Sequence, residues 1–189
     1  MSAFETYFQE QTALLRQIPP AQLEAVLNIL ERARAEQRTI FVFGNGGSAS
    51  TAAHFCADLS KNTRRAHLPH FRVLCLNDNM AMFSAYGNDE GYESVFAEPL
   101  KNLAQRGDVA LAISASGNSP NVLRGIETAN ALGLTTIGFA GFDGGKLNST
   151  AQMCIVVPSA SYEHIEDLHL MFCHALVATI KQKYPAVTT

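Results

Sequence analysis

The chain has 189 residues, of which 47% are hydrophobic and 16% are charged. This composition is typical of one domain with a sizeable core, and its apolar excess favours association with further copies of the chain. The 14 Lys and Arg residues against 17 Asp and Glu residues give a net charge of −3, which excludes a general attraction to nucleic acid or to an anionic membrane.

Four cysteines lie scattered within apolar segments, at positions 56, 75, 154 and 173. Without a Cys-x-x-Cys pair, we interpret them as reduced core cysteines of a cytoplasmic protein. The N-terminus does not have the basic, apolar and small-residue regions of a secretory signal, and no apolar run approaches the length of a membrane span. We therefore expect a cytoplasmic location.

Two amphipathic helices are predicted ahead of the first strand. Apolar side chains recur at helical spacing over residues 3–17, Pro19-Pro20 interrupts the pattern, and a second helix is predicted over 21–36. With no strand yet to cover, the helical segment 1–36 is a candidate subunit interface as well as a cap on the sheet. We expect residues 1–189 to form a single domain that includes this segment.

Short apolar runs then alternate with helical or turn-like segments. The predicted strands span residues 39–43, 71–76, 108–113, 135–140 and 153–157. The segments after them are predicted as helices over 48–60, 92–104, 121–132 and 162–183, with a glycine-rich turn over 141–146 and a loose tail over 183–189. Apolar strands separated by helices predict an α/β fold in three layers, with a parallel sheet covered on both faces.

Two turns rich in glycine and serine each follow a predicted strand and precede a helical pattern. The first is Gly44-Asn45-Gly46-Gly47-Ser48, and the second is Ser114-Ala115-Ser116-Gly117-Asn118-Ser119. In a parallel sheet both turns lie at the carboxyl edge, where backbone N–H groups, hydroxyls and helix N-termini converge on an anion. We therefore predict a site for a phosphorylated small molecule.

The first turn also fits the loose dinucleotide pattern Gly44-x-Gly46-x-x-Ala49, with Asp78 placed as a ribose-binding acid. The spacing from turn to acid is longer than usual, which weakens this interpretation. A nicotinamide oxidoreductase is kept as an alternative. The second turn favours phosphate, because an ordinary serine N-cap would use only one of its hydroxyls.

Histidines and carboxylates recur together on two predicted helices. His54 and Asp58 are four residues apart and project from one helix face, where they could share a metal ion or a substrate. On the last helix Asp167 and His174 are nearly eclipsed, and Glu166 lies about 80° from His174 at ~100° per residue. Either carboxylate could join His174, and satisfied core histidines are the competing interpretation.

Taken in order, these motifs resemble those of the phosphoheptose isomerases, sugar isomerase (SIS) domain proteins that convert sedoheptulose 7-phosphate to glycero-manno-heptose 7-phosphate. The resemblance is carried by Phe43-Gly44-Asn45-Gly46-Gly47-Ser48, His54-x-x-x-Asp58, Gly87-Asn88-Asp89-x-Gly91-Tyr92, Ser114-x-Ser116-Gly117-Asn118-Ser119, Asp143-Gly144-Gly145 and Ile165-Glu166-Asp167-Leu168-His169 through His174. It implies a five-stranded parallel sheet and a homotetramer with active sites shared between subunits. It also implies one zinc ion in each subunit.

The resemblance also implies residue roles. Substrate-binding positions would be Asn45, Gly46, Ser48, Asp89, Ser114, Ser116, Ser119 and Glu166, with the three serines of the second turn on the phosphate. Zinc ligands would be His54, Asp58, Glu166 and His174. Aldose–ketose isomerisation through an enediol needs a base, an acid and a group that stabilises an oxyanion. We assign these roles to Asp58, to His174 and to the metal, respectively.

Three departures from the family pattern stand in this chain. Asp58 replaces a usual Glu, Glu166 replaces a usual Gln, and Leu59-Ser60-Lys61-Asn62 replaces a segment that commonly ends in Gly-Arg. The first two still supply oxygen ligands, and an added carboxylate favours metal binding. Some relatives are instead non-catalytic tetramers that bind a phosphosugar or a protein such as the replication initiator. The presence of both His54 and His174 favours the enzyme.

Overall fold

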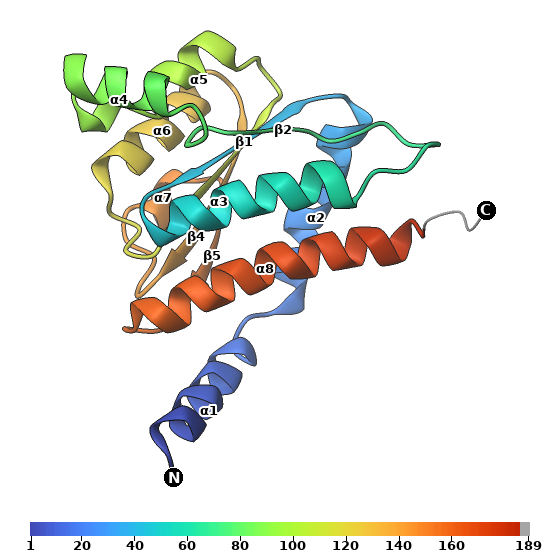
Figure 1. Cartoon of the computed structure of the whole chain (residues 1–189), viewed down its shortest axis with the longest axis vertical. Helices are drawn as coiled ribbons and strands as arrows, with labels where there is room; N and C mark the ends of the chain where they lie inside the picture. Colours follow the sequence, from blue (N-terminus) through green and yellow to red (C-terminus); the bar gives the residue numbers. More distant parts are fainter. Residues whose placement is uncertain (186–189) are drawn as a thin grey trace.

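The computed structural model describes residues 1–185 and shows a parallel sheet between two layers of helices (Figure 1). Within these residues the sheet has five strands in the order β2-β1-β3-β4-β5. The strands are β1 (Thr39–Gly44), β2 (Arg72–Cys75), β3 (Val109–Ser114), β4 (Thr135–Gly141) and β5 (Met153–Val157). The predicted three-layer α/β fold with a five-stranded parallel sheet is confirmed.

Helices cover both faces of this sheet. In chain order, the α-helices of the described residues are α1 (Ala3–Leu15), α2 (Pro20–Ala35), α3 (Gly47–Ala57), α4 (Met80–Asp89), α5 (Ala97–Leu103), α6 (Pro120–Ala131), α7 (Leu147–Thr150) and α8 (Tyr162–Lys183). Helices α2, α3 and α8 pack on one face through a core that includes Leu30, Phe55 and Phe172. Helices α5 and α6 pack on the other face, with Leu100 and Ile126 in its core. Alternate residues of the strands supply the sheet side of each core, as expected for a sheet buried on both faces.

The strand order places the two glycine- and serine-rich turns beside each other. Strand β1 pairs with β2 on one side and with β3 on the other, and Gly44 at the end of β1 is in register with Ile113 of β3. The chain therefore moves outward in opposite directions from β1 and β3, which makes this edge the topological switch point of the sheet. Ligands of open α/β sheets bind at that point.

Helix α4 was not predicted from the sequence. The Asn79 side chain accepts a hydrogen bond from the Met82 N–H and starts the helix, which leaves large apolar side chains such as Met80 exposed. The helix predicted over 92–104 is shorter than expected. It begins as a 3₁₀ turn, η2 (Tyr92–Ser94), and continues as α5 only from Ala97.

The helix predicted over 48–60 is α-helical in its first part and forms a π turn in its last part. Helix α3 ends at Ala57 and continues as a π turn, η1 (Asp58–Asn62). The Ser60 hydroxyl donates to the Ala57 carbonyl at 3.2 Å and the Thr63 hydroxyl donates to the Leu59 carbonyl at 2.6 Å. Both hydroxyls therefore bond backbone carbonyls at the change of helical winding.

Helix α1 projects from the body of the fold (Figure 1). A capping box of Ser2 and Glu5 starts it, and Tyr7 attaches it to α8 by donating a 2.7 Å hydrogen bond to Asp167. This bond raises the pKa of Tyr7 to about 12. On the rest of the helix, Phe4 and Phe8 are 76% and 64% exposed.

The helices near the N-terminus agree closely with the prediction from sequence. The predicted helices over 3–17 and 21–36 correspond to α1 and α2, and both ends of each helix lie within two residues of the expected limits. The tail predicted over 183–189 lies mostly outside the described residues. Over residues 1–185, no helix is both long and apolar enough to cross a bilayer.

Candidate functional site

A cavity of about 210 Å³ opens between the turns that follow β1 and β3. It is lined by Asn45, Ser48, Ser114, Ala115, Ser116, Ser119, Tyr162 and Glu166. We call this cavity the serine pocket. It brings together five of the substrate-binding residues predicted on the two turns, and Glu166 of α8 joins them.

The hydroxyls of the second turn face one another at the start of α6. The Ser114 hydroxyl donates to the Ser119 hydroxyl at 3.4 Å, and the Asn118 N–H donates to the Ser116 hydroxyl at 3.2 Å. Ser119 occupies the N-cap position, yet within the described residues its side chain makes no capping hydrogen bond. In the first turn of α6, Pro120 has no N–H, the Val122 N–H donates to Asn121 Oδ1, and the Leu123 N–H donates to the Ser119 carbonyl. The serine hydroxyls and the positive end of the helix dipole are therefore what this turn offers to an anion in the serine pocket.

A network of amides fixes Asn45 at the rim of the pocket. Asn45 and Asn121 exchange two side-chain hydrogen bonds of 2.8 and 2.9 Å, and the Tyr92 hydroxyl donates to Asn45 Oδ1 at 3.0 Å. Asn121 is buried beneath this network. Sequence reasoning missed Asn121 and the contact of Tyr92, although a polar residue one position inside the helix after a serine turn was an available signal.

Glu166 lies against the start of α3. A Cβ atom on Gly47 would lie 2.2 Å from Glu166 Oε2, so the missing side chain of Gly47 makes room for this carboxylate. Gly46, at φ 55°, adopts the left-handed conformation that turns the chain from β1 into α3. The neighbouring Asp167 bonds Tyr7 instead, which settles the choice between the two carboxylates: Glu166 faces the serine pocket.

A second polar group, which we call the histidine cluster, lies where α3 and α8 run side by side (Figure 1). Asp58 Oδ2 is 3.5 Å from His54 Nε2 and 3.9 Å from His174 Nε2, and the two ring nitrogens are 3.4 Å apart. One ligand atom from each residue lies within 4.8 Å of the others. The predicted meeting of His54, Asp58 and His174 is therefore present within one chain.

Two of the predicted roles, Glu166 as a metal ligand and Asp89 as a sugar contact, are not met within one chain. Glu166 precedes His174 by eight residues, about 12 Å along the helix axis at 1.5 Å per residue, so within one chain it joins the serine pocket rather than the histidine cluster. Asp89 ends α4 and accepts a 2.7 Å hydrogen bond from Asn88, away from the residues that line the serine pocket. A metal role for Glu166 and a sugar contact for Asp89 would need a second copy of the chain or a movement of α4.

The structure does not support the dinucleotide alternative. Asn77, rather than Asp78, contacts the first turn, because its side-chain amide bonds both the N–H and the carbonyl of Gly44. Asp78 lines a different cavity beside Cys56 and Cys75. An acid that binds a ribose next to the glycine turn is therefore missing from that position.

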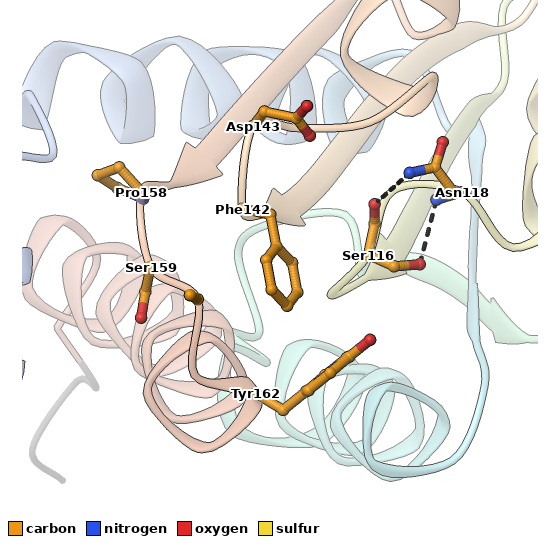
Figure 2. A pocket seen from close by; sticks show the side chains of 8 residues that line it. Ser116, Asn118, Phe142, Asp143, Pro158, Ser159 and Tyr162 are labelled. Carbon is orange, nitrogen blue, oxygen red and sulfur yellow. Dashed lines mark hydrogen bonds between the residues drawn. The ribbon is translucent and has the colours of Figure 1, made fainter.

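A larger side cavity of about 720 Å³ adjoins the serine pocket (Figure 2). The two share Ser116 and Tyr162, and the rings of Phe142 and Tyr162 meet edge to face at 5.1 Å. Phe142 is held at φ 53°, an unusual conformation for a bulky residue. The side cavity leaves room for a ligand to extend beyond the serine pocket.

The remaining histidine of the α8 motif, His169, belongs to the core. Its Nε2 atom is 3.0 Å from the Ala140 carbonyl and its ring packs beside Phe139. Burial lowers the pKa of His169 to about 4 despite this hydrogen bond. His169 is therefore a core histidine with only one ring nitrogen bonded, since its buried Nδ1 atom has no hydrogen-bond partner among the described residues.

This buried imidazole predicts a loss of stability in mild acid. Between pH 6.5 and 4 the unfolded chain binds a proton at His169 that the folded chain does not, so the free energy of unfolding falls as pH falls through this window. The full contribution, present above pH 6.5, is about 3 kcal/mol at 1.36 kcal/mol per pKa unit. Urea unfolding of wild type and of His169→Gln, which keeps a donor for Ala140, should show a smaller difference between pH 7.5 and pH 5 in the variant, by about 2 kcal/mol. Equal pH dependence in the two proteins would contradict this account.

Comparison with known proteins gives consistent matches. The SIS domain model matches residues 6–141. The chain is 42% identical to a phosphoheptose isomerase of Nitratiruptor sp. over 151 residues, which cover 78% of this chain and 79% of that protein. It is 35% identical to the phosphoheptose isomerase of Aquifex aeolicus over 161 residues, 85% of this chain and 84% of the relative. The solved structure of a phosphoheptose isomerase from Francisella tularensis superimposes with a TM-score of 0.87 at 27% identity, covering 95% of this chain and 94% of that one.

Proposed function

Since the chain belongs to the phosphoheptose isomerase family of SIS-domain proteins, we propose that it converts sedoheptulose 7-phosphate to D-glycero-D-manno-heptose 7-phosphate. The observation that carries this proposal is the pairing of a serine pocket at the switch point of the sheet with a cluster of two imidazoles and a carboxylate. The first suits the phosphate of the substrate and the second suits the carbons that exchange a proton.

The serine pocket would hold the phosphate and orient the sugar. Ser114, Ser116 and Ser119 offer hydroxyl donors, and the positive end of the α6 dipole lies beside them. Because the net charge of the chain is −3, the attraction of the anion is local to this pocket. Asn45, Ser48 and Glu166 line the pocket, and Gly46 lines a neighbouring cavity that shares Asn45, so these residues would bind the sugar hydroxyls. A phosphate fixed at one end makes the reacting carbons effectively intramolecular with the catalytic groups.

The histidine cluster fits a divalent metal, for which we propose Zn²⁺. Two imidazoles and one carboxylate are a common zinc donor set, and ring nitrogens that face each other at 3.4 Å gain a shared partner when a cation lies between them. His54, Asp58 and His174 would hold the ion, which when bound would stabilise negative charge on the substrate oxygen. Glu166 would add a fourth ligand only from a neighbouring copy.

The protein groups of the cluster account for the proton transfers. Asp58 would remove a proton from C1 of the ketose to give an enediol and return a proton to C2, while His174 would move the hydroxyl proton from O1 to O2. The net change is one hydrogen moved between adjacent carbons and one between their oxygens, so no oxidant is needed. Asp58 Oδ2 lies 3.9 Å from His174 Nε2, a separation that supports the assignment of the two side chains to one proton-transfer pair.

We further propose a cytoplasmic homotetramer whose active sites are shared between subunits. The separation of about 12 Å between Glu166 and His174 along α8 supports a site that residues of a second copy complete. The exposed apolar side chains of Phe4 and Phe8 on α1 offer a surface for that copy. The free thiols of the chain support a reducing compartment.

The function is tested by following ketose and aldose phosphates by NMR in purified protein supplied with Zn²⁺. We expect turnover of sedoheptulose 7-phosphate and, for Ser119→Ala, a KM raised about 10- to 100-fold, because a hydrogen bond to a charged group contributes about 1.5–3 kcal/mol. Ser149→Ala, which removes an exposed hydroxyl bonded to the Lys146 carbonyl, should leave KM within about twofold.

Absence of turnover with ketose phosphates of five to seven carbons would overturn the proposed activity and favour a non-catalytic binder of phosphosugars. An equal KM in Ser119→Ala and Ser149→Ala would show that the phosphate does not bind in the serine pocket.

A further inference from the structure

The two oxygens of the Asp58 carboxylate have different partners. Oδ2 faces the two imidazoles at 3.5 and 3.9 Å. Oδ1 accepts a 2.8 Å hydrogen bond from the side-chain amide of Asn62. One oxygen is therefore presented to the histidine cluster and the other is bonded to the amide four residues further along the chain.

The π turn brings this amide to the carboxylate. Asp58 begins η1 and Asn62 ends it, and Leu59 between them is fully buried and anchors the turn in the core. The hydroxyl of Thr63, itself buried, bonds the Leu59 carbonyl and helps to hold the unusual winding. π turns are rare in proteins and occur frequently at functional sites, since they change the direction in which side chains leave a helix.

A carboxylate that serves two imidazoles needs a fixed orientation. The Asp58 side chain is 21% exposed, so packing alone restricts its rotation only in part. A hydrogen bond to one oxygen limits rotation about the side-chain torsions and directs the other oxygen. Groups that bond to metal ligands in this way commonly contribute a factor of 10–100 to metal affinity or activity.

We propose that Asn62 is a positioning residue of the histidine cluster, which holds Asp58 so that Oδ2 faces both His54 and His174. The proposal rests on the proposed function, because it assigns to the cluster the Zn²⁺ and the proton transfers described above. Asn62 itself touches neither the metal nor the substrate. Its effect passes through the orientation of Asp58.

The test measures Zn²⁺ binding directly, by calorimetric titration of metal-free protein, together with kcat and KM. In Asn62→Ala we expect the dissociation constant for Zn²⁺ to rise about 10- to 100-fold. At saturating Zn²⁺ we expect kcat to fall while KM changes little, because the serine pocket lies about two helical turns away along α8. Asn62→Gln, which keeps an amide donor, should recover part of the affinity.

Asn102→Ala provides the matched control. Its amide donates a 2.8 Å bond to the Tyr86 hydroxyl at an exposed position, so the same kind of bond is removed elsewhere. Zinc affinity should stay within about twofold of wild type in this control.

Unchanged zinc affinity in Asn62→Ala, with or without a lower melting temperature of the metal-free protein, would overturn the assignment. An equal loss of zinc affinity in Asn102→Ala and Asn62→Ala would also overturn it. Asn62→Leu, which keeps the volume of the side chain, carries the test if the alanine variant unfolds. Wild-type protein that neither binds Zn²⁺ nor turns over a ketose phosphate would overturn the proposed function instead.

Discussion

Replacing Asp58 by asparagine is expected to lower kcat about 10²- to 10⁴-fold, the usual contribution of a positioned general base. The substitution keeps the shape of the side chain and an oxygen that can accept the hydrogen bond from Asn62. It removes the charge and the basic oxygen that face His54 and His174 at 3.5 and 3.9 Å. Steady-state kinetics at saturating Zn²⁺ separates this loss from weaker metal binding, and KM should change much less than kcat.

Asp167→Asn is the control for this experiment. Asp167 lies on α8 next to Glu166, and its side chain accepts a hydrogen bond from Tyr7 that asparagine can also accept. We expect kcat within about twofold of wild type, in the range of ordinary surface substitutions. Turnover by Asp58→Asn close to that of wild type would exclude Asp58 as the base.

The sheet and its two turns rich in glycine and serine were predictable because their signals are local. Continuous apolar runs such as Thr39–Gly44 and Val109–Ser114 can be buried on both faces only in a covered parallel sheet. Glycine and serine after each run then mark the carboxyl edge. The register of β1 and β3, which makes the two turns neighbours, follows from the pairing of these central strands.

Features set by distant contacts were not predictable. Helical periodicity did not decide whether Glu166 or Asp167 faces the candidate site. The choice depends on Tyr7 of α1, which lies 160 residues away in sequence and donates a hydrogen bond to Asp167. The resemblance assigns Asp89 to the sugar, and within one chain the structure has it at the exposed end of α4, so that assignment stays a prediction. The contact of Asn62 with Asp58 depends on a π turn, which a period of 3.6 residues does not predict.

The position of the two polar sites connects the fold to the chemistry. Both lie along the line where α3 and α8 run together, the serine pocket at their N-terminal ends and the histidine cluster about two turns further on. Helix dipoles favour an anion only at the first of these places, because their effect decays within one turn. The phosphate is therefore expected at the serine pocket, and the histidine cluster is where we propose the cation and the proton transfer.

Gly117→Ala is expected to destabilise the protein and to weaken phosphate binding together. Gly117 has φ 62°, and a Cβ atom there would lie 2.1 Å from the Gly144 carbonyl oxygen, a backbone atom that cannot rotate away. Its own carbonyl accepts a 2.9 Å hydrogen bond from the Leu147 N–H, which ties the serine turn to the start of α7. Relief of the clash must therefore move Ser116 and Ser119 away from each other or from the 143–146 turn.

We expect a loss of about 3 kcal/mol in the free energy of unfolding, the upper end of backbone strain at one residue, and a melting temperature lower by about 6–12 °C for a chain of this size. Gly87→Ala is the matched control. Gly87 lies inside α4 with its nearest foreign atom 3.6 Å from an added Cβ, so alanine should stabilise the helix by about 0.5–1 kcal/mol. Calorimetry and the KM for the ketose phosphate provide the two measurements. If Gly117→Ala has the melting temperature and the KM of wild type, the serine turn does not depend on the close approach of Gly117 and Gly144.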